Sequence, residues 1–164
     1  MEIIRRGEIV TSGWVHLADD EALPAAPADV TVSLGRWQAE REALLARGGQ
    51  VGVRLRPDDE LPQAPTELLD RPLLAVEFPK FTDGRGYTLG RLLRERHGYQ
   101  GELRAMGNVL RDQLFYLHRC GFDAFELQPG KSVTEALAAF DELSVRYQAA
   151  TDEPRPLFRR RADR

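Results

Sequence analysis

Cysteine is nearly absent from this sequence, since Cys120 is the only one in 164 residues. A single cysteine excludes an intrachain disulfide, a CxxC redox pair and an iron–sulfur cluster held by four cysteines of the chain. Cys120 follows a predicted helix and precedes Gly121. The carboxyl end of a helix raises the pKa of a thiol, so we interpret Cys120 as a small buried residue and not as an activated nucleophile.

Long apolar runs and a strong net charge are absent too. No stretch approaches the roughly 20 apolar residues that cross a bilayer. Residues 1–6 are not followed by the apolar core of a signal peptide. We therefore expect a cytoplasmic protein that does not associate with membranes. The net charge of −3 argues against a general nucleic-acid binder.

The motifs that hold common cofactors are also missing. Neither GxxxxGK[ST] nor GxGxxG occurs, which excludes the two best-known nucleotide-binding loops. His16, His97 and His118 are scattered, with no HxH or HxxxH spacing, so we predict no metal site. The sequence therefore identifies no cofactor.

One strand–loop–helix unit dominates what is present. Leu73–Phe78 is an apolar run of strand length in which only Glu77 is charged. Pro79 should end this strand because proline cannot donate a hydrogen bond to a neighbouring strand. Two glycines in residues 83–86 allow a sharp turn. Leucines at helical spacing follow, so the stretch predicts a buried strand, a polar loop and a helix.

Further strands are predicted at Val51–Leu55, Glu102–Met106 and Phe122–Leu127, with helices between them. This order predicts an α/β fold with a four-stranded, mainly parallel sheet of successive βα units. The similar lengths of the units favour a half-barrel-like arrangement, and a small doubly wound sheet is the alternative. A short N-terminal β-hairpin should turn at Arg6, and apolar spacing predicts a helix over Val133–Leu143.

We expect a single domain over residues 1–164. Its parts are an N-terminal hairpin and loop (1–30), a βα core (31–147) and a basic C-terminal tail (148–164). In the tail, residues 156–158 precede three arginines, which is typical of a mobile chain end or of a docking peptide.

Charged residues interrupt the predicted strands at positions that alternation would place on one face. These are Arg54, Glu77, Arg104 and Glu126. In a curved sheet they would converge on the concave side. Buried charges must pair or face water, so the cluster predicts a polar site with charges of alternating sign, and the alternatives are a charge network or a subunit interface.

The loop after Leu73–Phe78 predicts an anion site. Backbone amides and the positive end of a helix favour anions at such a place. The candidate anion-binding residues are Lys80, Thr82, Arg85, Arg104, Asn108 and Arg111. Glu77 and Asp83 are the candidates for an acid or base. The alternative is that Asp83 and Arg85 only fix the turn by local hydrogen bonds.

Four segments also carry a resemblance: residues 78–87, 101–105, 109–113 and 120–127. Together they resemble a bacterial family of unknown function. Its members are often described as oxidoreductases of sulfite reduction, because they tend to be encoded beside assimilatory sulfite reductase. The resemblance implies sulfite reductase as a partner and sulfite, or a similar small oxyanion, as a ligand.

Three functional hypotheses follow. The first is an accessory protein of assimilatory sulfite reduction that acts with sulfite reductase. The second is a small stand-alone enzyme acting on an anionic sulfur compound, with Lys80, Arg85 and Arg104 binding the anion and Glu77 or Asp83 as acid or base. The third is an oligomeric scaffold without catalysis, in which the open edges of a half-barrel pair between copies. A homodimer is expected on that ground.

Overall fold

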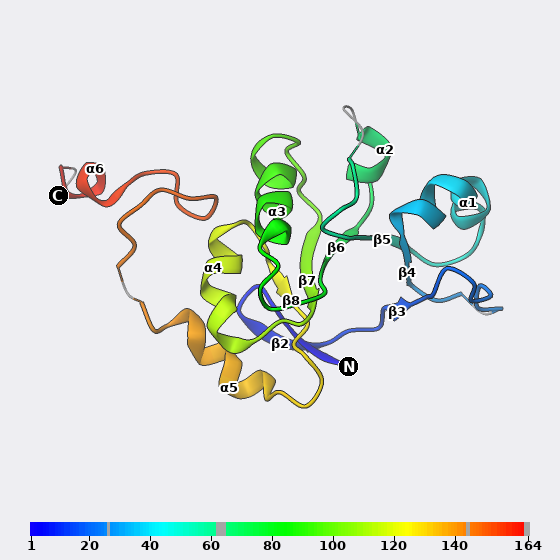
Figure 1. Ribbon diagram of the computed structural model, residues 1–164, viewed down its shortest axis with the longest axis horizontal. Coiled ribbons are helices and arrows are strands. Elements are labelled where there is room, and N and C mark those ends of the chain that lie inside the picture. The colour runs from blue at the N-terminus through cyan, green and yellow to red at the C-terminus, as the bar shows by residue number, and fades with distance from the viewer. Residues whose placement is uncertain (26, 62–64, 144, 163–164) are drawn as a thin grey trace.

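The computed structural model describes residues 1–25, 27–61, 65–143 and 145–162. Strands and helices alternate over most of this chain (Figure 1). The eight strands are β1 (Glu2–Arg5), β2 (Glu8–Thr11), β3 (Val15–His16), β4 (Val30–Ser33), β5 (Val51–Leu55), β6 (Leu73–Phe78), β7 (Glu102–Gly107) and β8 (Ala124–Phe125). The helices are α1 (Leu34–Ala46), α2 (Thr66–Leu69), α3 (Arg85–Glu95), α4 (Leu114–Arg119), α5 (Val133–Leu137) and α6 (Leu157–Ala162), with short 3₁₀ turns η1 (Arg111–Gln113) and η2 (Ala138–Phe140).

All eight strands belong to one mixed sheet in the order β2-β1-β8-β7-β6-β5-β4-β3. Strands β3 to β8 run parallel to one another, and the β1–β2 hairpin joins β8 antiparallel. The α/β class and the parallel βα units are therefore confirmed, but the prediction of four strands was wrong. The predicted hairpin is part of the sheet, and β3 and β4 were missed because they have two and four residues.

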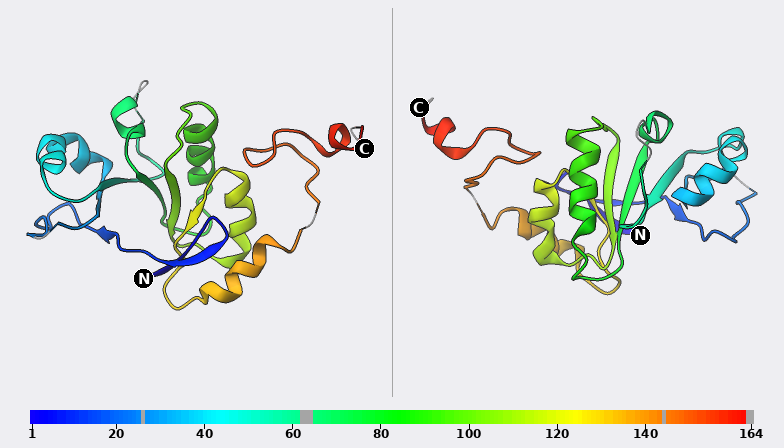
Figure 2. Two further views of the ribbon diagram at one scale, coloured as in Figure 1. Left: turned by 180° about the vertical axis from the view of Figure 1, so that it is seen from behind. Right: turned by 45° about the horizontal axis from the view of Figure 1, so that its top comes forward.

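The sheet is curled into a half-barrel because its two edge strands are joined by three residues. β2 and β3 lie at opposite edges, yet only residues 12–14 connect them. Four Cα steps reach at most about 14 Å, whereas eight strands laid flat would span roughly 34 Å. The sheet must therefore bend until its edges approach each other, and Figure 2 shows the N-terminal segment crossing from the hairpin toward α1.

The two faces of the sheet differ in chemistry. On one face the strands carry an apolar core, with Val53, Leu74 and Leu103 in register and fully buried. Helices pack on this side. We call the other side, which residues 12–17 cross, the inner face. There Arg54, Ala75, Arg104 and Ala124 lie in register across β5 to β8. Small alanines on alternate strands leave room for the arginines between them.

Helix ends explain most of the differences from the predicted helices. Ser33 caps α1, because its hydroxyl accepts a hydrogen bond from the Arg36 amide at 3.1 Å. The side chain of Asn108 could cap the next helix by its place after β7, but the helical turn begins only at Arg111, after Leu110. The predicted Val133–Leu143 helix was too long: it ends in η2 at Phe140, and Leu143 is exposed.

The C-terminal segment forms a projecting arm, which we define as residues 145–162. Figure 1 shows it leaving the βα body beside α4 and α5, on the far side of the molecule from α1. Its middle is tied back to the body, since Asp152 forms an ion pair with Arg119 of α4, and a second ion pair joins Asp152 to Arg146 within the arm. Thr151 donates to Glu95 of α3 at 3.0 Å. The predicted basic tail is thus anchored at one point; its residues 163–164, like residue 26 of the predicted N-terminal loop, lie outside the described residues.

Among the described residues, no helix is long and apolar enough to span a bilayer.

Candidate functional site

The inner face carries the four charged strand residues that alternation predicted to converge. Arg54 of β5 lies against Glu77 of β6, with 3.3 Å between Arg54 Nε and Glu77 Oε1. Arg54 also donates to the backbone oxygen of Leu17 at 2.6 Å, which fixes the crossing segment to the sheet. Arg56, one layer further along, lies 3.8 Å from the other oxygen of Glu77. In the Arg54–Glu77 pair, Glu77 is the more exposed side chain, with 30% of its surface accessible against 11% for Arg54.

Arg104 is the most deeply buried charge in this network, with 1% of its side chain exposed. Its Nε and Nη2 donate to Glu102 Oε1 at 2.9 and 2.6 Å. Its Nη1 donates to Ser12 Oγ at 3.1 Å and lies 3.7 Å from Glu126 Oε2. Such charge-assisted, forked contacts compensate for the loss of hydration. The guanidinium of Arg104 is therefore occupied by Glu102 and Glu126 inside the half-barrel.

His16 completes the network and was missed as a functional candidate. Its Nε2 lies 3.0 Å from Glu126 Oε2, and its Nδ1 lies 2.6 Å from the hydroxyl of Thr31. A carboxylate can only accept, so Nε2 donates to Glu126, and the Thr31 hydroxyl holds the other side of the ring. Glu126 is 110 residues away in sequence, and no local pattern signals this contact.

The loop after β6 is fixed by a local ion pair. Arg85 Nε and Nη2 donate to the two oxygens of Asp83 at 3.0 and 2.7 Å, and the Arg85 amide donates to Asp83 at 3.2 Å. The hydrogen bonds from the Arg85 side chain lower the pKa of Asp83 from 3.8 to about 2. Asp83 therefore stays ionised at neutral pH and is poorly suited to donate a proton.

The remaining predicted anion-site residues fall into two groups. Lys80 and Thr82 are exposed in the loop, and neither side chain forms a hydrogen bond or ion pair with another residue that the structure describes. Asn108 lies beside them, because its amide donates to the backbone oxygen of Phe78 at 2.7 Å. Arg111 is directed elsewhere: its guanidinium pairs with Glu142 and donates to the Glu135 backbone at 3.1 Å.

Arg85→Ala should return the pKa of the Asp83 carboxyl from about 2 toward its ordinary value of 3.8. The measurement is a carboxyl carbon NMR titration. Since the folded pKa is depressed, any stability from this pair is present above pH 4 and is lost as the pH falls toward 2. Arg91→Ala, which breaks an exposed pair with Glu95 on the same helix, is the control and should leave Asp83 unchanged. An unchanged Asp83 pKa in Arg85→Ala would refute the pairing.

The described residues offer neither a cluster of metal ligands nor an activated thiol. No group of three histidine, cysteine, aspartate or glutamate side chains comes together there to hold a metal ion. Cys120 is buried as predicted, with 6% exposed, and burial raises the pKa of its thiol. A protonated thiol is a weak nucleophile.

The fold and its ion pairs define a class: an α/β protein whose half-barrel sheet has a charged inner face. The chain belongs to a bacterial family of unknown function, DUF934, whose family model matches residues 52–158. The match begins in β5 and ends in α6, so it includes the loop after β6 and most of the arm. The predicted resemblance to such a family is thus confirmed. No curated protein and no solved structure matches the chain.

Proposed function

We propose that this chain is an accessory protein of assimilatory sulfite reduction that acts by binding sulfite reductase through its C-terminal arm. The link to sulfite reductase rests on the resemblance of residues 78–127 to a family encoded beside that enzyme. The observation that carries the binding role is the arm itself. It presents large apolar side chains to solvent from a segment that is tied to the body.

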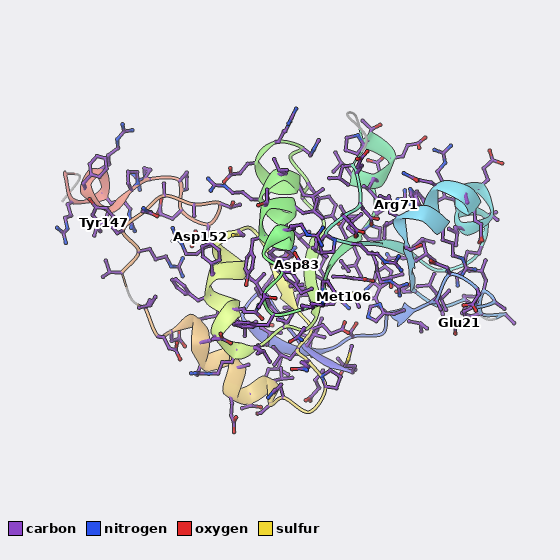
Figure 3. The ribbon with its side chains drawn as sticks, viewed as in Figure 1. Glu21, Arg71, Asp83, Met106, Tyr147 and Asp152 are labelled. Atoms are coloured by element: carbon purple, nitrogen blue, oxygen red, sulfur yellow. The ribbon has the colours of Figure 1, made fainter. Side chains whose placement is uncertain are left out.

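Three apolar side chains of the arm are exposed: Val145 by 60%, Tyr147 by 68% and Phe158 by 59%. Figure 3 shows Tyr147 on the outer part of the arm, while Asp152 lies at its contact with the body. Aromatic side chains held in place are typical anchors of protein interfaces, since they bury much area at a small cost in conformational entropy.

The charge of the arm indicates the chemistry of the partner surface. The arm holds five arginines and two acidic residues, whereas the whole chain has 23 basic and 26 acidic residues. A basic segment on an acidic protein favours an acidic surface on the partner and would speed their encounter.

An oxyanion at the carboxyl ends of the strands remains part of the proposal. Lys80, Thr82 and Asn108 are the candidate groups that the ion pairs leave available there. The stand-alone enzyme is the weaker alternative, because the pairing with Arg85 keeps Asp83 ionised and Glu77 lies between two arginines. A homodimer through the open edge of β2 is the other alternative, and Ile9 on that edge is 36% exposed.

The test measures binding of the purified chain to purified sulfite reductase by calorimetry. Tyr147→Ala and Phe158→Ala should each weaken binding about tenfold or more, because truncating a buried aromatic anchor removes much of the interface energy. Leu45→Ala is the matched control, since Leu45 is 50% exposed on α1, far from the arm.

If both arm variants bind as tightly as the unmodified chain, the arm is not the docking element. If the unmodified chain does not bind sulfite reductase at all, the accessory role fails. Analytical ultracentrifugation of the same samples decides whether a homodimer competes with that partner.

A further inference from the structure

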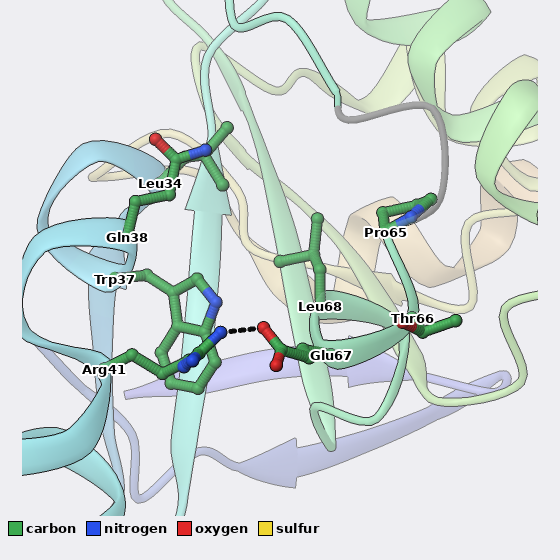
Figure 4. Close-up of a pocket in the computed structure, with 8 residues that line it drawn as sticks. All are labelled: Leu34, Trp37, Gln38, Arg41, Pro65, Thr66, Glu67 and Leu68. Carbon is green, nitrogen blue, oxygen red and sulfur yellow. Dashed lines mark hydrogen bonds and ion pairs between the residues drawn. The ribbon is translucent and has the colours of Figure 1, made fainter.

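A pocket of about 260 Å³ lies between α1 and α2, on the side of the molecule opposite the arm (Figure 4). Leu34 and Trp37 of α1 and Leu68 of α2 supply apolar wall. Arg41 and Glu67 form an ion pair between the two helices, drawn as a dashed line in Figure 4. Because these two charges neutralise each other, the pocket offers little attraction to an ionic group.

Trp37 gives this pocket a donor without an acceptor. Only 4% of the residue is exposed, so the ring belongs to the core. Figure 4 shows the indole nitrogen on the ring edge that faces Leu68 and the pocket. In the part of the chain that the structure describes, no acceptor bonds to this N–H. The nitrogen itself is not fully buried, so this N–H reaches the pocket, where a water or the acceptor of a ligand can bond to it.

The indole is held rigidly enough to act as a recognition group. The guanidinium of Arg71 lies 4.9 Å from the centre of the ring, within the range of a cation–π contact. The ring packs in the main core cluster of buried residues. Its N–H direction is therefore fixed before any ligand arrives, which lowers the cost of binding.

We propose that this pocket binds a small planar heteroaromatic molecule, or the heteroaromatic end of a larger one, through a hydrogen bond from Trp37 Nε1–H to a ring acceptor. The volume lies just below the range of roughly 300–1,000 Å³ usual for small-molecule pockets, so it suits one ring system. The aliphatic and indole walls favour a flat apolar body. The amide of Gln38 and the hydroxyl of Thr66, at the pocket wall, would select substituents on the ring.

Two isosteric probes test the inference on the full chain: quinoline, which has one ring acceptor, and naphthalene, which has none. The readout is the nitrogen–proton NMR resonance of the Trp37 indole. The chain has two tryptophans, and Trp14→Phe assigns the Trp37 signal by leaving it alone in the spectrum. Quinoline should shift this signal in a saturable way, and naphthalene should bind about fivefold to tenfold more weakly, as expected for one lost hydrogen bond.

Trp37→Phe keeps an aromatic wall but removes the donor, so the preference for quinoline over naphthalene should disappear. Binding of this variant is followed by ligand-observed saturation-transfer NMR. Equal affinity of the unmodified chain for the two probes would overturn the proposal, as would a shift of the Trp14 indole alone. Should Trp37→Phe fail to fold, the comparison of the two probes on the unmodified chain decides the question by itself.

Discussion

Replacing Arg104 by alanine is expected to destabilise the fold by about 3–5 kcal/mol, the largest effect of any single substitution proposed for this chain. The change removes the buried guanidinium that lies against both Glu102 and Glu126, and Arg104 itself is 1% exposed. Two carboxylates would be left in a poorly hydrated interior. Urea unfolding followed by circular dichroism measures the loss. Because a domain of this size is stable by about 5–15 kcal/mol, the variant would be partly unfolded at elevated temperature.

Arg5→Ala is the matched control, because Arg5 contacts the same carboxylate. Its Nη1 lies 3.6 Å from Glu102 Oε2, but 49% of its side chain is exposed. Exposed ion pairs contribute about 0–1 kcal/mol, so Arg5→Ala should be nearly neutral. Neutralising the partner in Arg104→Met/Glu102→Gln should restore part of the stability. A loss below about 1 kcal/mol in Arg104→Ala would show that water reaches the inner face.

Gly90→Ala is expected to destabilise the chain by about 1–3 kcal/mol through overpacking. A Cβ at Gly90 would lie 2.4 Å from Cε2 and 2.6 Å from Cζ of Phe122. Phe122 is 1% exposed and packs edge-on against Phe78 at 5.9 Å between ring centres. The ring therefore cannot move aside without disturbing the core between α3 and the sheet. Thermal unfolding measures the effect.

Gly35→Ala tests whether the loss at Gly90 is steric. Gly35 is also helical, but a Cβ there meets no heavy atom within 4 Å. Alanine is favoured over glycine within a helix by about 1 kcal/mol, so the stability of the Gly35→Ala variant should rise by up to that amount. A loss of stability in Gly90→Ala together with a gain in Gly35→Ala would support the close approach of α3 to Phe122. Equal gains at both would contradict it.

Alternation along a strand is a local property, and it predicted the shared face of the charged residues correctly. Arg54, Glu77, Arg104 and Glu126 each stand between apolar neighbours, and the pairs Arg54–Glu77 and Arg104–Glu126 are present. The contact of His16 with Glu126 could not be predicted in the same way. It depends on how the sheet curls, and that depends on the three-residue connection from β2 to β3.

Length limits the prediction of strands, and spacing alone does not fix where a helix ends. Two residues of β3 and four of β4 are too few to show a period, although all four residues of β4 are buried. Apolar spacing continues to Leu143, but the backbone leaves the helix at Phe140 and exposes Leu143. The anchoring of the arm could not be predicted either, because Asp152 and Arg119 form their ion pair although 33 residues separate them in the sequence.

The pairing of β1 with β8 has a consequence for how the chain is made. Ile4 lies opposite Phe125, so β1 can pair with β8 only after more than a hundred further residues have been synthesised. At roughly 5–20 residues per second, synthesis of that stretch takes roughly 6–24 seconds. During this time Ile3 and Ile4, which are buried in the folded protein, remain exposed on the nascent chain. The edge of β1 that pairs with β8 stays uncovered as well. Strand β1 is thus made long before β8 but cannot complete its pairing in the sheet until β8 has been synthesised.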